Sequence, residues 1–308
     1  MWYNARMRTY LGTWQVSPTD GFWTDQDPSS AEAVLASAVR KGITGFDTAQ
    51  SYGKGRAEQI LGKILRRFPD RSFDVDTKIM PTTRSLDDVL KTSLHNLSGI
   101  DIDTLYLHWP SGNFDNAALI REISALKDKG LCRKTGVCNL PLAMLKEFVS
   151  SGIVIDRLQR PVSLLWTRDL SETIAFCRNH GIELAAYSPT GMGLLSGKYR
   201  CAADLKDARA TLFCFSPGCI GAFHDLLDVI GQTASRHGST CTAVALAWVR
   251  HVEPDILIIG ARSTQQLKEN LDCRPVLSEQ EISDLDLAAF RLENASRSVC
   301  ENIFSYNW

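Results

Sequence analysis

The sequence lacks the features that would indicate a membrane, a nucleic acid or a metal ion as a partner. No apolar run reaches the length that spans a bilayer, and no charged segment followed by an apolar one opens the chain. Lysine and arginine number 34 against 35 aspartate and glutamate, so the formal charge of -1 indicates no basic surface for nucleic acid. The expected partner is therefore a small molecule.

Cysteine is scattered along the chain rather than grouped. The nine cysteines form no C-x-x-C pair and no Cys/His cluster with the spacing of zinc ligands, so we predict no metal site. A chain of 308 residues needs no disulfides to be stable, and unpaired cysteines are typical of a reducing compartment. We therefore expect a cytoplasmic protein.

Alternating strand-like and helix-like segments predict the fold. With 44% hydrophobic residues the chain can bury a large core. Short runs rich in Val, Ile, Leu and Tyr alternate with stretches of helical periodicity, which is typical of β-α units around a parallel sheet. The runs that we interpret as strands are 8–15, 42–49, 73–79, 102–109, 134–139, 155–162, 182–188 and 255–260. Eight strands, each followed by a helix, predict an α/β fold, a (β/α)8 TIM barrel, as one domain over residues 1–308.

Two helices between these strands carry end signals. In the first, Ser29 or Ser30 is the expected N-cap and Gly42 the expected stop. In the second, Ser85 and Gly99 have the same roles.

Two further segments depart from the alternation. The connection 189–221 is longer than usual and carries Gly, Lys and Arg, so we interpret it as a cofactor-side binding loop. Ser278 and Glu281 stand at capping-box spacing and predict an extra C-terminal helix.

Four side chains are expected to meet at the mouth of this barrel. Asp47, Lys78 and His108 stand at the ends of the second, third and fourth strands, and Tyr52 lies on the loop after the second. A neighbouring ammonium favours a phenolate, so Lys78 is expected to tune Tyr52. Each residue alone also has a structural explanation: a turn carboxylate, an exposed strand-end charge or a hydrogen-bonded histidine. Their joint occurrence at strand ends favours catalysis.

The motifs around these residues resemble the aldo-keto reductase family. The segments are "GITGFDTAQSYGKGRAEQILGKIL", "DTKI", "LYLHWP", "KTGVCNL", "AAYSPTGMGLLSGKY" and "ILIIGARSTQQLKEN". The resemblance implies that Tyr52 donates a proton, that Lys78 and Asp47 tune it, and that His108 orients a substrate carbonyl. The implied reaction is hydride transfer from NADPH to an aldehyde or ketone.

A phosphate site is expected after the eighth strand. Ser263 and Thr264 open a helix beside Arg262, and a helix N-terminus next to a permanent positive charge favours an anion. A surface helix with an exposed arginine is the alternative. The family resemblance implies that the anion is the 2'-phosphate of NADPH.

The resemblance also implies the other cofactor contacts. Asn139 and Gln159 would bond the nicotinamide amide, Tyr187 would stack on its ring, and Lys198 and Arg209 would clamp the pyrophosphate. The alternatives are packing at the barrel mouth for Tyr187 and a solvated loop charge for Lys198. No Rossmann-type glycine fingerprint is present, which fits a barrel that binds its cofactor in an extended pose. The remaining residues assigned to the cofactor are Ser188, Gly260, Gln266, Glu269 and Asn270.

Two departures from the family pattern stand out. Cys138 replaces the usual serine, and a thiol is a weaker hydrogen-bond donor. It is either a redox-sensitive group beside the nicotinamide or an inert buried thiol. Only ten residues precede Leu11, so the N-terminal hairpin that closes the barrel base in the family is expected to be abbreviated or absent. An uncovered base would favour a homo-oligomer.

Loop aromatics predict the substrate pocket without naming the substrate. The candidates are Trp14, Phe22, Trp23 and Trp109, together with the C-terminal tail, although such side chains also pack against barrels. Two alternatives to a carbonyl reductase stay open. One is an NADPH-binding sensor resembling the potassium-channel β subunits, and the other is an NAD-dependent sugar or polyol dehydrogenase, which Arg262 disfavours.

Overall fold

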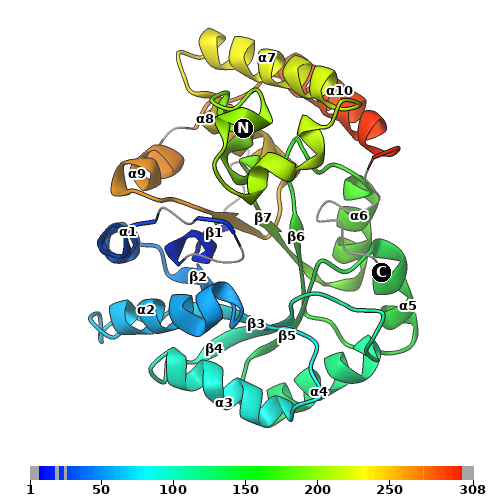
Figure 1. Ribbon diagram of the computed structural model, residues 1–308. Coiled ribbons are helices and arrows are strands. Elements are labelled where there is room, and N and C mark those ends of the chain that lie inside the picture. Colours follow the sequence, from blue (N-terminus) through cyan, green and yellow to red (C-terminus); the bar gives the residue numbers. More distant parts are fainter. Residues whose placement is uncertain (1–6, 18–20, 24–25, 273, 300–308) are drawn as a thin grey trace.

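The computed structural model is a closed barrel of eight parallel strands in sequence order (Figure 1). It describes residues 7–17, 21–23, 26–272 and 274–299. The strands are β1 (Arg8–Gly12), β2 (Gly45–Asp47), β3 (Asp74–Ile79), β4 (Ile102–Leu107), β5 (Lys134–Cys138), β6 (Arg157–Pro161), β7 (Glu183–Tyr187) and β8 (Ile256–Ile259). The predicted TIM barrel is confirmed.

All eight predicted strands are present, but most are shorter than the apolar runs suggested. The run 8–15 ends as a strand at Gly12, since a 3-10 turn, Trp14–Val16, follows. The run 102–109 ends at Leu107. Pro110 follows closely and has no N–H to extend a ladder.

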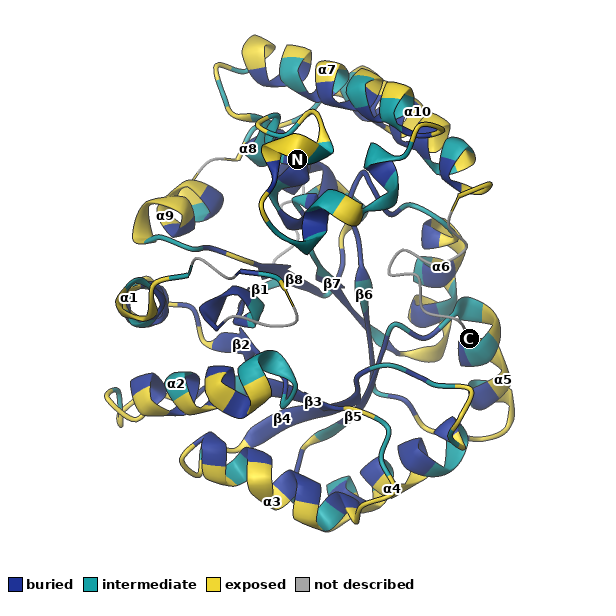
Figure 2. Ribbon diagram, viewed as in Figure 1, coloured by how far each residue is buried: buried dark blue, intermediate teal, exposed yellow. Residues whose placement is uncertain are grey.

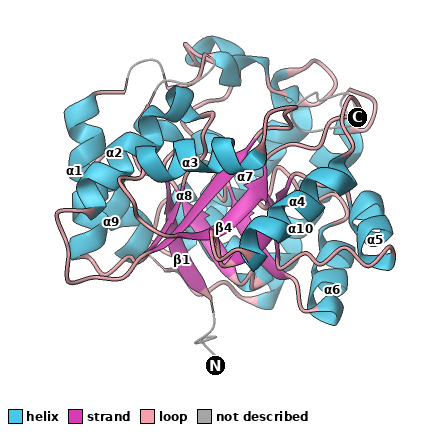
Figure 3. Ribbon diagram, turned by 90° about the horizontal axis from the view of Figure 1, so that it is seen from below, coloured by secondary structure: helices cyan, strands magenta, loops and turns pink. Residues whose placement is uncertain are grey.

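Helices enclose the barrel on its outside (Figure 3). They are α1 (Pro28–Arg40), α2 (Arg56–Leu65), α3 (Leu86–Asn96), α4 (Asn116–Asp128), α5 (Leu142–Ser150), α6 (Leu170–His180), α7 (Ile220–Arg236), α8 (Cys241–Val252), α9 (Thr264–Asp272) and α10 (Glu279–Ser296). The predicted cap of α1 at Ser29 or Ser30 is wrong. The Asp27 carboxylate accepts from the Ser30 backbone N–H at 2.8 Å, and Pro28 takes the first helical position, for which its fixed φ is suited.

Other end signals are confirmed. Ser85 is the N-cap residue of α3, although its side chain makes no capping hydrogen bond. Gly42 and Gly99 follow α1 and α3 with φ of 87° and 74°. Ser278 and Glu281 form the predicted capping box of α10.

The connection from β7 to β8 is more structured than expected. One helix was predicted there, but α7 and α8 both lie between these strands, and α7 packs beside α10 (Figure 1). Before α7 the chain makes four short 3-10 turns: Gly191–Ser196, Ala202–Asp204, Ala208–Thr211 and Phe213–Phe215. The predicted loop 189–221 is therefore a series of tight turns.

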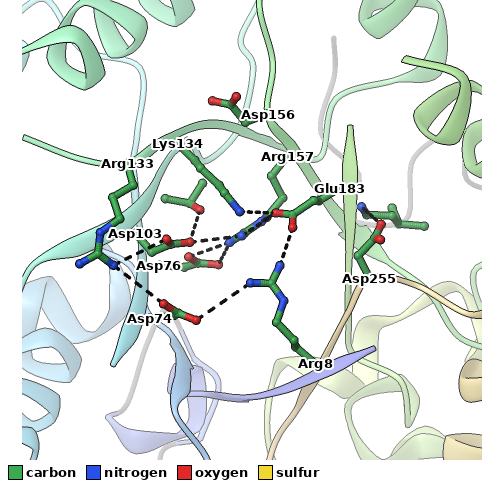
Figure 4. A network of polar contacts seen from close by, with 12 residues as sticks. Arg8, Asp74, Asp76, Asp103, Arg133, Lys134, Asp156, Arg157, Glu183 and Asp255 are labelled. Atoms are coloured by element: carbon green, nitrogen blue, oxygen red, sulfur yellow. Dashed lines mark hydrogen bonds and ion pairs between the residues drawn. The ribbon is translucent and has the colours of Figure 1, made fainter. Parts of the chain in front are cut away.

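Apolar side chains and charged side chains are buried in different parts of the barrel. The hydrophobic core lies between the strands and the inner faces of the helices, so Figure 2 shows the strands as buried and the helices as buried on one side. The inside of the barrel instead holds buried charges. The Arg157 side chain is fully buried and donates two bonds, at 2.9 and 2.8 Å, to Asp76 (Figure 4). β6 and β3 are not neighbours, so this pair spans the interior.

Arg157 gathers charges from several strands. Its guanidinium also donates to Asp103 at 3.2 Å and to Glu183 at 2.7 Å (Figure 4). Burial alone would lower the pKa of Arg157, but its neighbours, among them Tyr106 and Asp76, outweigh this and raise it. The side chain therefore stays charged.

Two glycines make room for aromatic rings inside the barrel. A Cβ at Gly45 would lie 2.0 Å from the ring of Tyr10, and one at Gly136 would lie 2.4 Å from the ring of Tyr106. The Tyr106 hydroxyl donates to Asp76 at 3.1 Å. These glycines thus allow the polar interior to close.

Two questions from the sequence concern the chain ends and the membrane. The abbreviated N-terminal hairpin falls mainly on residues 1–6, which lie outside the described residues, as does the tail 301–308 with its aromatic side chains. Within the described part of the chain, no helix combines the length and hydropathy needed to cross a bilayer.

Arg157→Met is expected to lower the free energy of unfolding by about 3–5 kcal/mol, because it leaves the buried Asp76 carboxylate without its counter-ion. Urea unfolding followed by circular dichroism measures this. The matched control is Arg133→Met, whose side chain is 53% exposed and whose ion pairs are worth about 0–1 kcal/mol. Equal losses in the two variants would contradict the central role of Arg157.

Candidate active site

The C-terminal ends of the strands open into a cavity of about 700 Å³. This volume lies within the range of about 300–1,000 Å³ that is typical of ligand sites. Most of the residues that the sequence assigned to catalysis, cofactor or substrate line the cavity; among the described ones, Lys78, Ser263 and Thr264 do not. The Lys78 side chain is fully buried beneath it.

Lys78 connects the predicted catalytic side chains. Its ammonium donates to Asp47 Oδ1 at 2.7 Å, to the Thr48 carbonyl at 2.8 Å and to the Tyr52 hydroxyl at 3.3 Å. Asp47 and Lys78 come from adjacent strands, whereas Tyr52 begins a 3-10 turn after β2. The sequence prediction that these groups meet is confirmed as geometry.

A glycine-dependent turn brings Tyr52 to this position. Gly53 has φ of 55°, and a Cβ there would lie 2.1 Å from the Ser17 hydroxyl oxygen. Gly55 has φ of 87°. Residues with a side chain rarely adopt such positive φ angles. The two glycines therefore favour the backbone turn that places the Tyr52 phenol at the cavity.

Burial is the largest influence on the pKa of Tyr52. It raises the pKa of Tyr52, and the Lys78 ammonium only partly opposes the rise. Burial lowers the pKa of Lys78, but Asp47 outweighs this and the net direction is upward. The sequence analysis predicted the direction of the Lys78 effect on the Tyr52 pKa correctly, but it left out the effect of burial. Tyr52 therefore holds its proton at neutral pH, and Lys78 stays charged.

His108 closes the catalytic group on the side of β4. Its Nδ1 lies 3.3 Å from the Ser51 hydroxyl, and its ring meets the Tyr52 ring edge-on at 5.7 Å. Burial, with Lys78, lowers the pKa of His108 well below its ordinary value. The imidazole is therefore neutral, and it can donate one N–H to a carbonyl oxygen without charge.

The side chains expected around a nicotinamide form one hydrogen-bonded group. Tyr187 donates to Asn139 Oδ1 at 2.7 Å, and Asn139 Nδ2 donates to the His108 carbonyl at 3.2 Å. Asn139 and Ser188, which directly follow β5 and β7, have positive φ of 58° and 51°. Such angles in residues other than glycine are concentrated at functional sites.

Cys138 lies beside this group and is buried. Burial raises the pKa of its thiol, which keeps the sulfur protonated. Since the thiolate is the reactive form, this favours the inert buried thiol over the redox-sensitive group.

The helix that the sequence predicts at the expected phosphate site is present and begins at Thr264. Ser263 Oγ accepts from the Gln266 backbone N–H at 3.1 Å at the start of α9. Arg262 donates from Nε to Gln26 at 2.9 Å, and its backbone N–H donates to the Gln266 side chain at 2.8 Å. Asn270 donates to the Gly260 carbonyl at 2.9 Å.

The two cations expected at the pyrophosphate differ in their surroundings. Lys198 is exposed at the cavity. Arg209 is buried, donates to both oxygens of Asp207 and also to the Met192 carbonyl at 3.0 Å. Its charge is thus largely compensated within its own loop.

The aromatic side chains extend along the cavity. Trp14 contacts Phe22 at 4.9 Å and Tyr52 at 6.3 Å between ring centroids, and Trp109 lies 6.2 Å from His108. These rings surround the catalytic end. Trp23 meets the Trp14 ring edge-on at 5.6 Å and also contacts two guanidinium groups, 4.8 Å from Arg209 and 5.9 Å from Arg262, so it connects these rings to the expected nucleotide end.

The sequence analysis missed several lining residues. Met80, one residue after β3 and 41% exposed, lines the cavity, as do Gln15 and Ser51. Their position within four residues of strand ends is the signal that would have found them.

Comparison with known proteins identifies the family. The model of the Aldo/keto reductase family matches residues 9–289. This chain belongs to the aldo/keto reductase family. Among its relatives is the NADH-specific methylglyoxal reductase of Escherichia coli, 27% identical over 92% of this chain and 93% of that protein. A probable voltage-gated potassium channel subunit beta of Arabidopsis thaliana is 27% identical over 83% of this chain and 85% of that protein.

A solved structure supports the fold of this aldo/keto reductase. The glycerol dehydrogenase of Gluconobacter oxydans superposes with a TM-score of 0.78 at 24% identity, covering 92% of this chain and 91% of that one. The similarity agrees with the closed barrel described above.

His108 is expected to stay neutral throughout the working range, because its pKa is lowered. The ¹H–¹⁵N spectrum of its imidazole should keep the pattern of a neutral ring from about pH 8 to about pH 5.5. The His108→Gln variant identifies the signal. A titration midpoint near the ordinary value of about 6.5 would contradict this.

Proposed function

We propose that this aldo/keto reductase reduces an aldehyde or ketone to the alcohol with NADPH, and that Tyr52 is the general acid. The observation that carries the proposal is the buried chain from Asp47 through Lys78 to Tyr52, which ends at a cavity beside a neutral His108. The reverse reaction would use Tyr52 as the base.

The described residues fit a nicotinamide dinucleotide. The cavity extends from Tyr52 to Asn270, and its far end combines Arg262 with the start of α9. The residues that would hold the cofactor are Asn139, Gln159, Tyr187, Ser188, Lys198, Arg209, Gly260, Arg262, Gln266, Glu269 and Asn270. The reduced nicotinamide, when bound, would supply the hydride.

The side chains of this protein would manage the proton. The His108 N–H would bond the substrate carbonyl oxygen and polarise it, while Tyr52 would transfer its proton to the same oxygen as negative charge develops there. Lys78 would stabilise the phenolate left behind, and Asp47 would keep Lys78 in place.

The preference for NADPH rests on Arg262, whose permanent charge suits a 2'-phosphate. The NADH-specific relative shows that a family member can use the other coenzyme. The substrate pocket formed by Trp14, Phe22 and Trp109 would suit an apolar carbonyl compound.

The similarity to a potassium channel subunit favours one alternative, an NADPH-binding sensor. Binding of NADPH without turnover of aldehydes would distinguish it. An NAD-dependent polyol dehydrogenase would show itself by a preference for NAD⁺. A single domain over residues 1–308, a cytoplasmic location and a homo-oligomer remain predictions.

Tyr52→Phe is expected to lower kcat for aldehyde reduction by about 10²- to 10⁴-fold, since it removes the general acid. Turnover of 4-nitrobenzaldehyde with NADPH measures this, and a fluorescence titration with NADPH confirms that the variant still binds. Equal rates in parent and variant would contradict the role of Tyr52. Binding without turnover in either protein would favour the sensor.

Arg262→Ala is expected to weaken NADPH binding by about 10- to 150-fold, which corresponds to the loss of a charged hydrogen bond of about 1.5–3 kcal/mol. NADH binding should change little. Fluorescence titration of both coenzymes measures this, with Lys268→Ala, an exposed cation on the helix α9 that follows Arg262, as control. Equal weakening of both coenzymes would contradict a 2'-phosphate contact.

A further inference from the structure

Gln159 makes a contact that its expected cofactor role does not explain. Its amide nitrogen donates to Asp47 Oδ2 at 2.7 Å, and both residues are almost fully buried, at 2% and 3% exposure. β6 and β2 are not neighbouring strands, so this bond crosses the barrel interior. The other oxygen of Asp47 accepts from Lys78 at 2.7 Å. The carboxylate is thus held from both sides.

The bond to Asp47 determines how the Gln159 amide is oriented. An ionised carboxylate only accepts hydrogen bonds, so the amide must present its N–H to Asp47 and its carbonyl oxygen elsewhere. The Cys138 thiol, a weak donor, lies 3.6 Å from that oxygen. Gln159 also lines the cavity. Its oxygen is therefore suited to accept a stronger hydrogen bond from a ligand N–H.

We propose that Gln159 is a positioning residue that couples the nicotinamide end of the cavity to the proton donor Tyr52 through Asp47 and Lys78. This rests on the proposed function. The Gln159 N–H orients the Asp47 carboxylate and reduces its pull on Lys78, which leaves the ammonium available to Tyr52 at 3.3 Å. A ligand N–H on the Gln159 oxygen polarises the amide and strengthens its bond to Asp47.

The other titratable groups near Gln159, Asp47 and Lys78 do not take over the effect of Gln159 on Tyr52. They come from β1, β3, β4, β5, β6 and β7 and are Tyr10, Asp76, Tyr106, His108, Cys138, Arg157 and Tyr187. Asp76 and Arg157 are paired with each other. The charge that contacts the Tyr52 hydroxyl is instead the Lys78 ammonium, which is itself paired with Asp47.

The test compares Gln159→Met and Gln159→Leu with the parent. Both remove the N–H given to Asp47, so Lys78 is drawn toward Asp47 and the Tyr52 proton is held more tightly. In alcohol oxidation, Tyr52 acts as the base. The rising limb of the kcat–pH profile should therefore shift to higher pH by about half a pH unit or more. Two variants are used so that one suffices if the other does not fold.

Asn139→Ala is the matched control. Asn139 is the other expected partner of the nicotinamide amide, but its side chain contacts Cys138, Tyr187 and the His108 carbonyl rather than Asp47. It should raise the KM for the coenzyme and leave the limb in place. The proposal would be overturned if the rising limb stays at the parent's pH in both Gln159 variants, or if it shifts equally in Asn139→Ala. Gln159 would then be a cofactor contact only.

A second measurement separates this proposal from the proposed function. With Tyr52 replaced by 3-nitrotyrosine, ionisation of the phenol is followed by its visible absorbance without any turnover. The midpoint should be higher in Gln159→Met than with Gln159 present. Absence of turnover in the parent with either coenzyme would refute the reductase function, whereas equal midpoints would refute the positioning role.

Discussion

The buried guanidinium of Arg157 is the interaction on which the interior of this barrel depends. It joins carboxylates from β3, β4 and β7 to β6 and so ties strands that are not neighbours (Figure 4). A buried charge is tolerated only when it is paired and hydrogen-bonded. The charges therefore require the barrel to close in one arrangement, with each partner at its observed place.

The group proposed for catalysis stands directly above this network. Successive residues of a strand point to opposite faces, so side chains two positions apart share the barrel interior. Asp47, Lys78, His108, Cys138 and Gln159 each follow by two residues a member of the layer below: Gly45, Asp76, Tyr106, Gly136 and Arg157. The polar lower layer thus supports the group that contains the proposed proton donor, and it separates that group from the base of the barrel.

The proposed nucleotide end of the cavity is assembled differently, from loops rather than strands. Trp23, on the loop after β1, packs against Arg209 from the β7 connection and Arg262 before α9. The Ala208 N–H donates to the Gly21 carbonyl at 3.3 Å and joins the same two loops. Loop contacts of this kind can separate without disturbing the barrel, which would suit the proposed site for a long cofactor.

The sequence by itself determined the eight strands, the capping box of α10 and the meeting of Asp47, Lys78, Tyr52 and His108, because these follow from local periodicity and from the common end of parallel strands. Only the tertiary structure decided the partners of Arg157, the bond from Gln159 to Asp47 and the upward direction of the Tyr52 pKa. Each of these depends on which side chains face one another across the closed barrel and on how completely water is excluded. Neither property is encoded in the spacing of residues along the chain.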